Sequence, residues 1–159
     1  MLALGFLGCS AQGSDAAPPT PDVSVDIGVG GGADGLEFES LAPGAVLPLH
    51  TFGQGGTHAL LAVRCSGLGD RAFVNVSITD PARGIQASAP AGPSPRLLAC
   101  DAKGVLCDLL PILVMTGGLV PPDPTGPMVP VQIHADARNP AGIWVSAERE
   151  ARLDPASLE

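Results

Sequence analysis

Apolar and polar residues alternate along most of the chain in short runs, and clusters of Gly, Pro, Asn, Asp and Ser separate these runs. Such alternation predicts β-strands that are buried on one face, because successive side chains of a strand point to opposite sides. No apolar spacing typical of a helix persists over three turns. The predicted strands cover residues 36–40, 45–50, 57–65, 72–79, 85–89, 96–100, 105–115, 129–137 and 143–148.

About seven to nine short strands, with turn signals every ~8–12 residues, are typical of an antiparallel sandwich or barrel. Trp144 follows all 4 cysteines, so the Cys–Trp–Cys order of antibody domains is missing. We therefore expect an all-β, antiparallel β-sandwich that is immunoglobulin-like in architecture, with its topology open. The clearest inward faces are Ala59, Leu61, Val63 and Cys65; Ala72, Val74, Val76 and Ile78; and Val129, Val131, Ile133 and Ala135.

The two ends of the chain lack a sustained pattern. Residues 10–35 mix Pro-rich, acidic and Gly-rich pieces, which cannot bury enough apolar surface to offset the entropy of ordering. We predict a disordered linker at 10–35, a β-sandwich domain at 36–150 and a disordered tail at 151–159. Within the linker, the alternating piece at 23–29 is a candidate for an added edge strand.

The net charge of −8 comes mainly from the ends of the chain. Residues 10–39 hold six acidic residues and no basic residue, whereas acidic and basic residues balance within 40–147. The chain has no basic patch interleaved with aromatic residues, so we expect no binding to nucleic acid.

The N-terminal sequence indicates a targeting signal, which determines the location of the protein, rather than a part of the fold. The apolar run at 2–7 is too short to span a bilayer and is similar to the end of a secretory signal. Phe6-Leu7-Gly8-Cys9 resembles the bacterial lipobox, which ends at a cysteine that is acylated after cleavage. The resemblance implies that residues 1–9 are a signal remnant ending at the lipid-bearing Cys9, whose several acyl chains would hold the protein at a membrane. Ser10 stands where an inner-membrane retention signal places Asp, so the resemblance favours the outer membrane.

Three cysteines remain for the domain. Cys100 and Cys107 flank a turn-like hexapeptide, and an oxidising envelope favours a disulfide across it. Closing this loop would stabilise the fold by about 2–3 kcal/mol. Cys65 is then a free thiol in the core, while pairing of Cys65 with Cys100 or with Cys107 stays open.

The Gly-rich stretch at 53–58 is unusual but is not a phosphate loop, because a predicted strand rather than a helix follows it. We expect Gly53, Gly55 and Gly56 to adopt positive φ at a structural turn, with the His58 ring placed to cap it.

The sequence favours neither a metal site nor catalysis. His50, His58, Cys65 and Met115 are possible metal ligands, but no CxxC, HxxxH or Cys-His-Met cluster accompanies them. We expect His58 and His134 to face solvent, with no metal and no cofactor. GxSxG and HExxH motifs and suggestively spaced carboxylates are also missing, so the chain is not predicted to be an enzyme.

One stretch resembles a known group. Gln54-Gly55-Gly56-Thr57-His58, followed by Leu61-Ala62-Val63-Arg64 and Gly67-Leu68, is similar to the Gln-Gly-Gly-x-His turn of uncharacterised lipoproteins from GC-rich Gram-negative bacteria. Leu110-Pro111 is a possible further correspondence. The resemblance implies a β-sandwich lipoprotein and no activity.

These patterns predict a lipid-anchored, non-catalytic module of the cell envelope that binds a protein or glycan or serves structurally. The alternative is a periplasmic metal- or ligand-binding domain that uses some of His50, His58, Cys65 and Met115.

Overall fold

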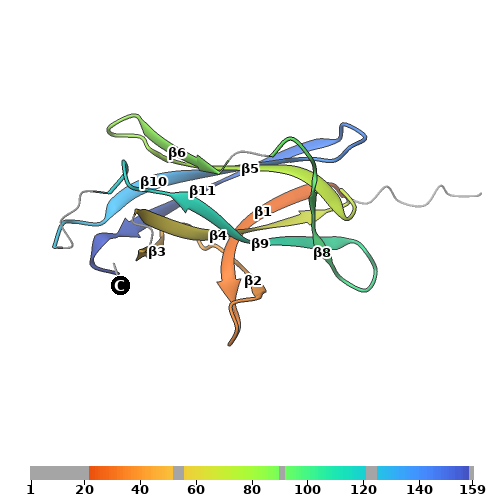
Figure 1. Cartoon of the computed structure of the whole chain (residues 1–159), viewed down its shortest axis with the longest axis horizontal. Coiled ribbons are helices and arrows are strands. Elements are labelled where there is room, and N and C mark those ends of the chain that lie inside the picture. The colour runs from red at the N-terminus through yellow and green to blue at the C-terminus, as the bar shows by residue number, and fades with distance from the viewer. Residues whose placement is uncertain (1–21, 52–55, 90–91, 121–124, 158–159) are drawn as a thin grey trace, which may run out of the picture.

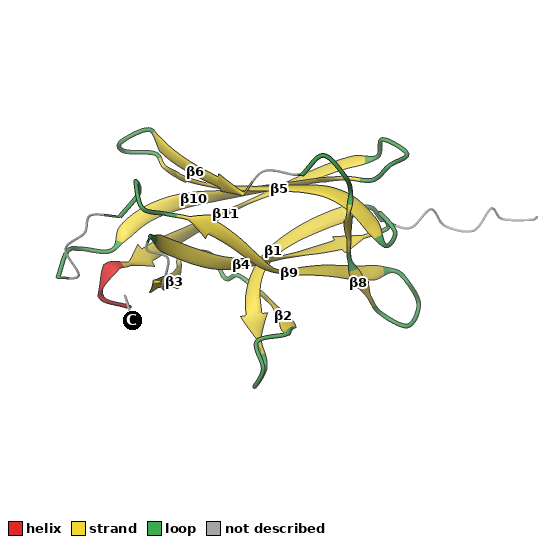
Figure 2. Cartoon of the chain, in the orientation of Figure 1, coloured by secondary structure: helices red, strands yellow, loops and turns green. Residues whose placement is uncertain are grey.

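The computed structural model describes residues 22–51, 56–89, 92–120 and 125–157, and these residues are mainly β-structure (Figure 2). The predicted all-β class is confirmed, with eleven strands among the described residues rather than seven to nine. One turn of 3₁₀-helix follows the last strand, at Pro155–Ser157. The strands are β1 (Ser24–Gly31), β2 (Glu37–Ser40), β3 (Ala45–Thr51), β4 (Thr57–Ser66), β5 (Arg71–Asp80), β6 (Ile85–Ala89), β7 (Arg96–Leu97), β8 (Ala99–Cys100), β9 (Leu106–Met115), β10 (Val129–Arg138) and β11 (Trp144–Asp154).

The strands form two layers, which Figure 1 shows one above the other. The first layer contains β2, β1, β4, β9 and β8, and the second contains β11, β10, β5 and β6, with β7 beside β5. β3 joins the layers, because 49–51 pair with β4 and 45–48 pair with β11. The pairing of β3 with β11 is parallel, so the prediction of a wholly antiparallel sandwich is wrong at this one place.

The core lies between the layers, on the faces that alternation predicts. All twelve residues assigned inward on β4, β5 and β10 are buried. The outer faces of β5 and β10 carry mostly polar side chains, whereas the outer face of β4 and β9 also carries Leu60, Leu113 and Met115. These faces are where a binding site can lie.

The predicted linker at 10–35 is wrong for its second half, which contains β1. Val25 is buried and Ile27 fully so, and 24–28 pair with β4. Arg149 of β11 donates to Asp26 over 2.6 Å and thereby ties β1 to the second layer. The acidic, Gly-rich composition suggested disorder, but a strand needs apolar residues only at alternate positions. Residues 10–21 lie outside the described residues.

The predicted disordered tail is also wrong up to residue 157. β11 continues to Asp154, and both Ala151 and Leu153 are buried. The hydroxyl of Ser157 accepts a hydrogen bond from the Leu49 N–H over 2.7 Å, just where β3 leaves β11. The segment up to Ser157 therefore belongs to the fold and contacts the join between the layers.

Among the described residues, no helix has the length and apolar character to cross a membrane.

Candidate functional site

Aromatic residues make up 3% of the chain, yet two of them share one row on the outer face of a sheet. Trp144, the single tryptophan, begins β11 and is 58% exposed. It lies opposite Arg138 of β10, which in turn lies opposite Phe73 of β5. Directly opposite residues share a face, and this face is the outer one, because the neighbouring Ala72, Val74 and Ala137 are buried in the core. We call Phe73, Arg138 and Trp144 the aromatic row.

Two guanidinium groups give the aromatic row a positive charge. The Arg138 guanidinium carbon lies 5.0 Å from the centre of the Phe73 ring, a cation–π contact. Arg71 is exposed and lies on the same face, two positions before Phe73 on β5. Neither Arg71 nor Arg138 forms an ion pair with a described residue. Both charges are thus available to a ligand.

A hollow of about 390 Å³ lies beside the row and is lined by polar groups as well as rings. Asn75 Nδ2 donates to Asp136 Oδ1 over 2.9 Å, which holds both side chains in place. Asp136 Oδ2 also lies 3.8 Å from His134 Nε2. The lining residues are Phe73, Asn75, Gly92, Asp136, Arg138 and Trp144. The arrangement can stack against a flat apolar face and hydrogen-bond its edge.

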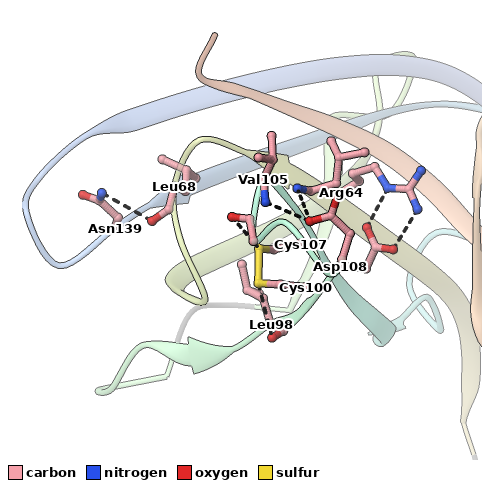
Figure 3. Close-up of a disulfide and its surroundings, with 11 residues drawn as sticks. Arg64, Leu68, Leu98, Cys100, Val105, Cys107, Asp108 and Asn139 are labelled. Carbon is pink, nitrogen blue, oxygen red and sulfur yellow. Dashed lines mark hydrogen bonds and ion pairs between the residues drawn. A yellow bond between two sulfur atoms is a disulfide. The ribbon is translucent and has the colours of Figure 1, made fainter. Parts of the chain in front are cut away.

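The tight turn between β10 and β11 positions Trp144. Its sequence is Asn139-Pro-Ala-Gly142, with Pro and Gly at the places that a type I turn favours. Asn139 Oδ1 accepts from the Ile143 N–H over 2.9 Å, and Gly142 has φ +91°. Asn139 Nδ2 also donates to the Leu68 carbonyl over 3.4 Å, which fastens the turn to the loop between β4 and β5 (Figure 3). The tryptophan therefore projects from a fixed backbone.

The predicted disulfide between Cys100 and Cys107 is present and joins β8 to β9 (Figure 3). The carboxylate of Asp101 accepts from the Val105 N–H over 2.9 Å, which lowers the pKa of Asp101 and orders the loop between the cysteines. Beside the disulfide, Arg64 forms a bidentate ion pair with Asp108, over 2.7 and 2.8 Å. The disulfide, the hydrogen bond within its loop and the ion pair together restrain this end of the first layer.

Cys65 is the free core thiol that the sequence predicts. It is buried and lies opposite Cys107 on β9. Burial raises the pKa of Cys65 to about 11, and the negative charge of Asp108 adds to the shift.

The Cys65 shift predicts a loss of stability in alkali. The folded chain holds the thiol proton more tightly than the unfolded chain, so this stabilisation is complete below about pH 9 and is lost as the pH rises through about 11. Urea titrations across this range should show the free energy of unfolding falling less for Cys65→Ala than for the wild type. Parallel curves for the two proteins would contradict this assignment.

Only some of the other predicted site residues lie within the part of the chain that the structure describes. Cys9, Gly53 and Gly55 lie outside the described residues, whereas Gly56 has the positive φ expected of it, +92°. The prediction that His58 faces solvent is wrong, because His58 is only 6% exposed although it lies on the outer face of β4. Gly56 lies beside the ring, since a Cβ there would lie 3.7 Å from His58 Cε1. His134, by contrast, has a 40% exposed side chain, 3.5 Å from Glu148.

The strand register brings together some of the possible metal ligands and separates others. His50 lies opposite His58, and His58 lies opposite Met115, so these three share the outer face of the first layer. Cys65 is on the core face and does not join them. Among the described residues, no group of three or more His, Cys, Asp or Glu side chains could hold a metal. Next to His50, a groove of about 410 Å³ runs between the β1–β2 hairpin and β3.

Comparison of the chain with protein-family models, with curated proteins and with solved structures finds no match. The aromatic row was not a predicted site, although alternation places Phe73 outward from the sequence alone. The missing information was the register, because only pairing between distant strands brings Arg138 and Trp144 to Phe73.

Proposed function

We propose that the chain is a lipid-anchored, non-catalytic module of the cell envelope that binds an acidic saccharide on the aromatic row. The observation that carries the proposal is the placement of an exposed Trp144 and a half-buried Phe73 on either side of an arginine that forms no ion pair with a described residue. Exposing a large aromatic side chain leaves apolar area in water that a ligand could cover.

The chemistry of the row suits a sugar acid. The C–H face of a pyranose ring is apolar and can stack on an aromatic ring, while its hydroxyls can bond to Asn75 and Asp136 at the wall of the hollow. A carboxylate matches the planar donor fork of Arg138, and Arg71 adds a second positive charge on the same face. A protein partner fits less well, because the next row on this face, Asn75–Asp136–Ser146, is polar throughout.

The lining of the hollow supports binding rather than hydrolysis. Asp136 is its one carboxylate, and Asn75 donates a hydrogen bond to that group. Hydrolysis of a glycosidic bond generally uses two carboxyl groups on opposite sides of the bond.

Binding to immobilised oligosaccharides tests this function. We expect the full chain to be retained by uronate-containing oligosaccharides more strongly than by their neutral counterparts, and less strongly at high salt, because ions screen exposed charges. Retention of a peptide library in place of any saccharide, or no retention at all, would overturn the proposal.

If Cys9 carries the proposed lipid anchor, the substitution Cys9→Ser should abolish membrane attachment completely. Without the Cys9 thiol no acyl chains can be attached, so we expect the variant to take up no fatty-acid analogue and to leave the membrane fraction. Cys65→Ser is the matched control and should keep both label and location, because Cys65 is buried in the core. Persistent labelling of Cys9→Ser would count against the lipoprotein assignment. The residue after Cys9, Ser10, favours the outer membrane as the destination.

A further inference from the structure

We propose that His50, His58 and Met115 form a binding site for a soft monovalent metal ion, Cu⁺. The site lies on the first layer, so it shares no residue with the aromatic row and does not depend on saccharide binding.

The register places the three side chains on one face. His50, His58 and Met115 follow one another across β3, β4 and β9 as directly opposite residues. Directly opposite residues have Cβ atoms about 4.5–5.5 Å apart, so the side chains on β3 and β9 can both reach the central His58. Their neighbours Leu49, Ala59 and Val114 are fully buried, which confirms that the row faces away from the core.

Gly56 lies beside two of the ligands. A Cβ atom at Gly56 would lie 3.7 Å from His58 Cε1 and 3.7 Å from Met115 Cε. The His58 Cε1 atom lies between the two ring nitrogens, and the Met115 methyl is bonded to the sulfur, so potential donor atoms are close to one position. Gly56 leaves that position open because it has no side chain.

The site combines a buried ligand with a solvent-exposed one. His58 is only 6% exposed, so a bound ion would be partly shielded from water, while Met115 is 61% exposed and can turn toward or away from it. His50 lines the groove of about 410 Å³, so this ligand can be reached from solvent. Methionine is flexible and polarisable, which suits a ligand that closes over an ion.

The types of donor atom in the row determine which metal ion it would prefer. Imidazole nitrogen and thioether sulfur suit Cu⁺, whereas Ca²⁺ and Mg²⁺ require oxygen ligands. No acidic residue occurs in β3, in β4 or in residues 109–115 of β9. Glu39, on β2, is the one acidic residue among the described residues that line the groove. The row is therefore poor in the hard ligands that would favour other cations.

Methyl NMR of the full chain can test the site, with Ag⁺ as a diamagnetic probe that has the same ligand preference. The chain is labelled at the methionine methyls and carries Cys9→Ser, which removes the N-terminal thiol. We expect the Met115 methyl resonance to shift and saturate, while that of Met128, which lies outside the row, stays in place. His50→Ala should weaken binding at least about ten-fold, since removing even an indirect partner of a ligand costs ~10–100-fold. His134→Ala, the matched control on the other layer, should leave the affinity unchanged.

His50 is the ligand to replace, because it is only half-buried and its loss should leave the fold intact. The proposal is overturned if the Met115 resonance does not move with Ag⁺, if Met128 moves in parallel, or if His50→Ala binds as tightly as His134→Ala.

Discussion

Replacing Ile27 with alanine is expected to lower the free energy of unfolding by about 3 kcal/mol, within the ~2–5 kcal/mol range for removing most of a buried aliphatic side chain. Ile27 is fully buried in the core and lies opposite Val63 of β4. Its strand also contributes Asp26, which holds Arg149 of the second layer. Denaturant titration of the purified chain measures the effect.

Leu36→Ala is the matched control, because it removes a similar side chain from the same part of the chain. Leu36 is 65% exposed, so its replacement should cost little. Equal effects of the two substitutions would mean that β1 does not belong to the core and that the domain begins after it.

Replacing Trp144 with alanine is expected to weaken the binding of an acidic oligosaccharide about 30-fold, since truncating an aromatic anchor commonly costs about 2 kcal/mol or more. The reason is the loss of the ring face against which the sugar would stack.

Arg138→Ala should act differently: it should weaken the binding of acidic oligosaccharides more than that of neutral ones, because it removes charge. Calorimetric titration with matched acidic and neutral oligosaccharides separates the two effects.

The other layer supplies a control for these substitutions. Arg64 lies over the Phe38 ring at 4.4 Å, which repeats the pairing of Arg138 with Phe73. Asp108, however, neutralises the charge of Arg64 through a bidentate ion pair. Phe38→Ala should therefore leave saccharide binding unchanged. If Phe38→Ala weakens binding as much as Trp144→Ala does, the aromatic row is not the binding surface.

Much of the fold was predictable because one face of each long strand is apolar. The inward faces of β4, β5 and β10 follow directly from alternation, and so does the core position of Cys65. The Cys100–Cys107 disulfide was predictable because the two residues flank a short turn. Each of these features depends on residues that are close in sequence.

Features that depend on distant residues were missed. Composition favoured a linker over β1, and the alternation at 23–29 suggested only an added edge strand, whereas β1 pairs with both β2 and β4. Gly28 is needed where β2 crosses, because a Cβ there would lie 2.2 Å from the Glu39 carbonyl oxygen. His58 was expected to face solvent because alternation places it on the outer face of β4, yet it is only 6% exposed. The aromatic row was not recognised because its three residues are assembled by the register of β5, β10 and β11.

The fluorescence of Trp144 tests the central claim most directly, because the chain has 1 tryptophan and no tyrosine. Saccharide binding on the aromatic row must change the surroundings of that one exposed indole. Titration with a uronate-containing oligosaccharide should shift the emission to shorter wavelength, protect it from a soluble quencher and saturate. Binding of the same oligosaccharide, measured independently, with no change in the emission or quenching of Trp144 would contradict the account.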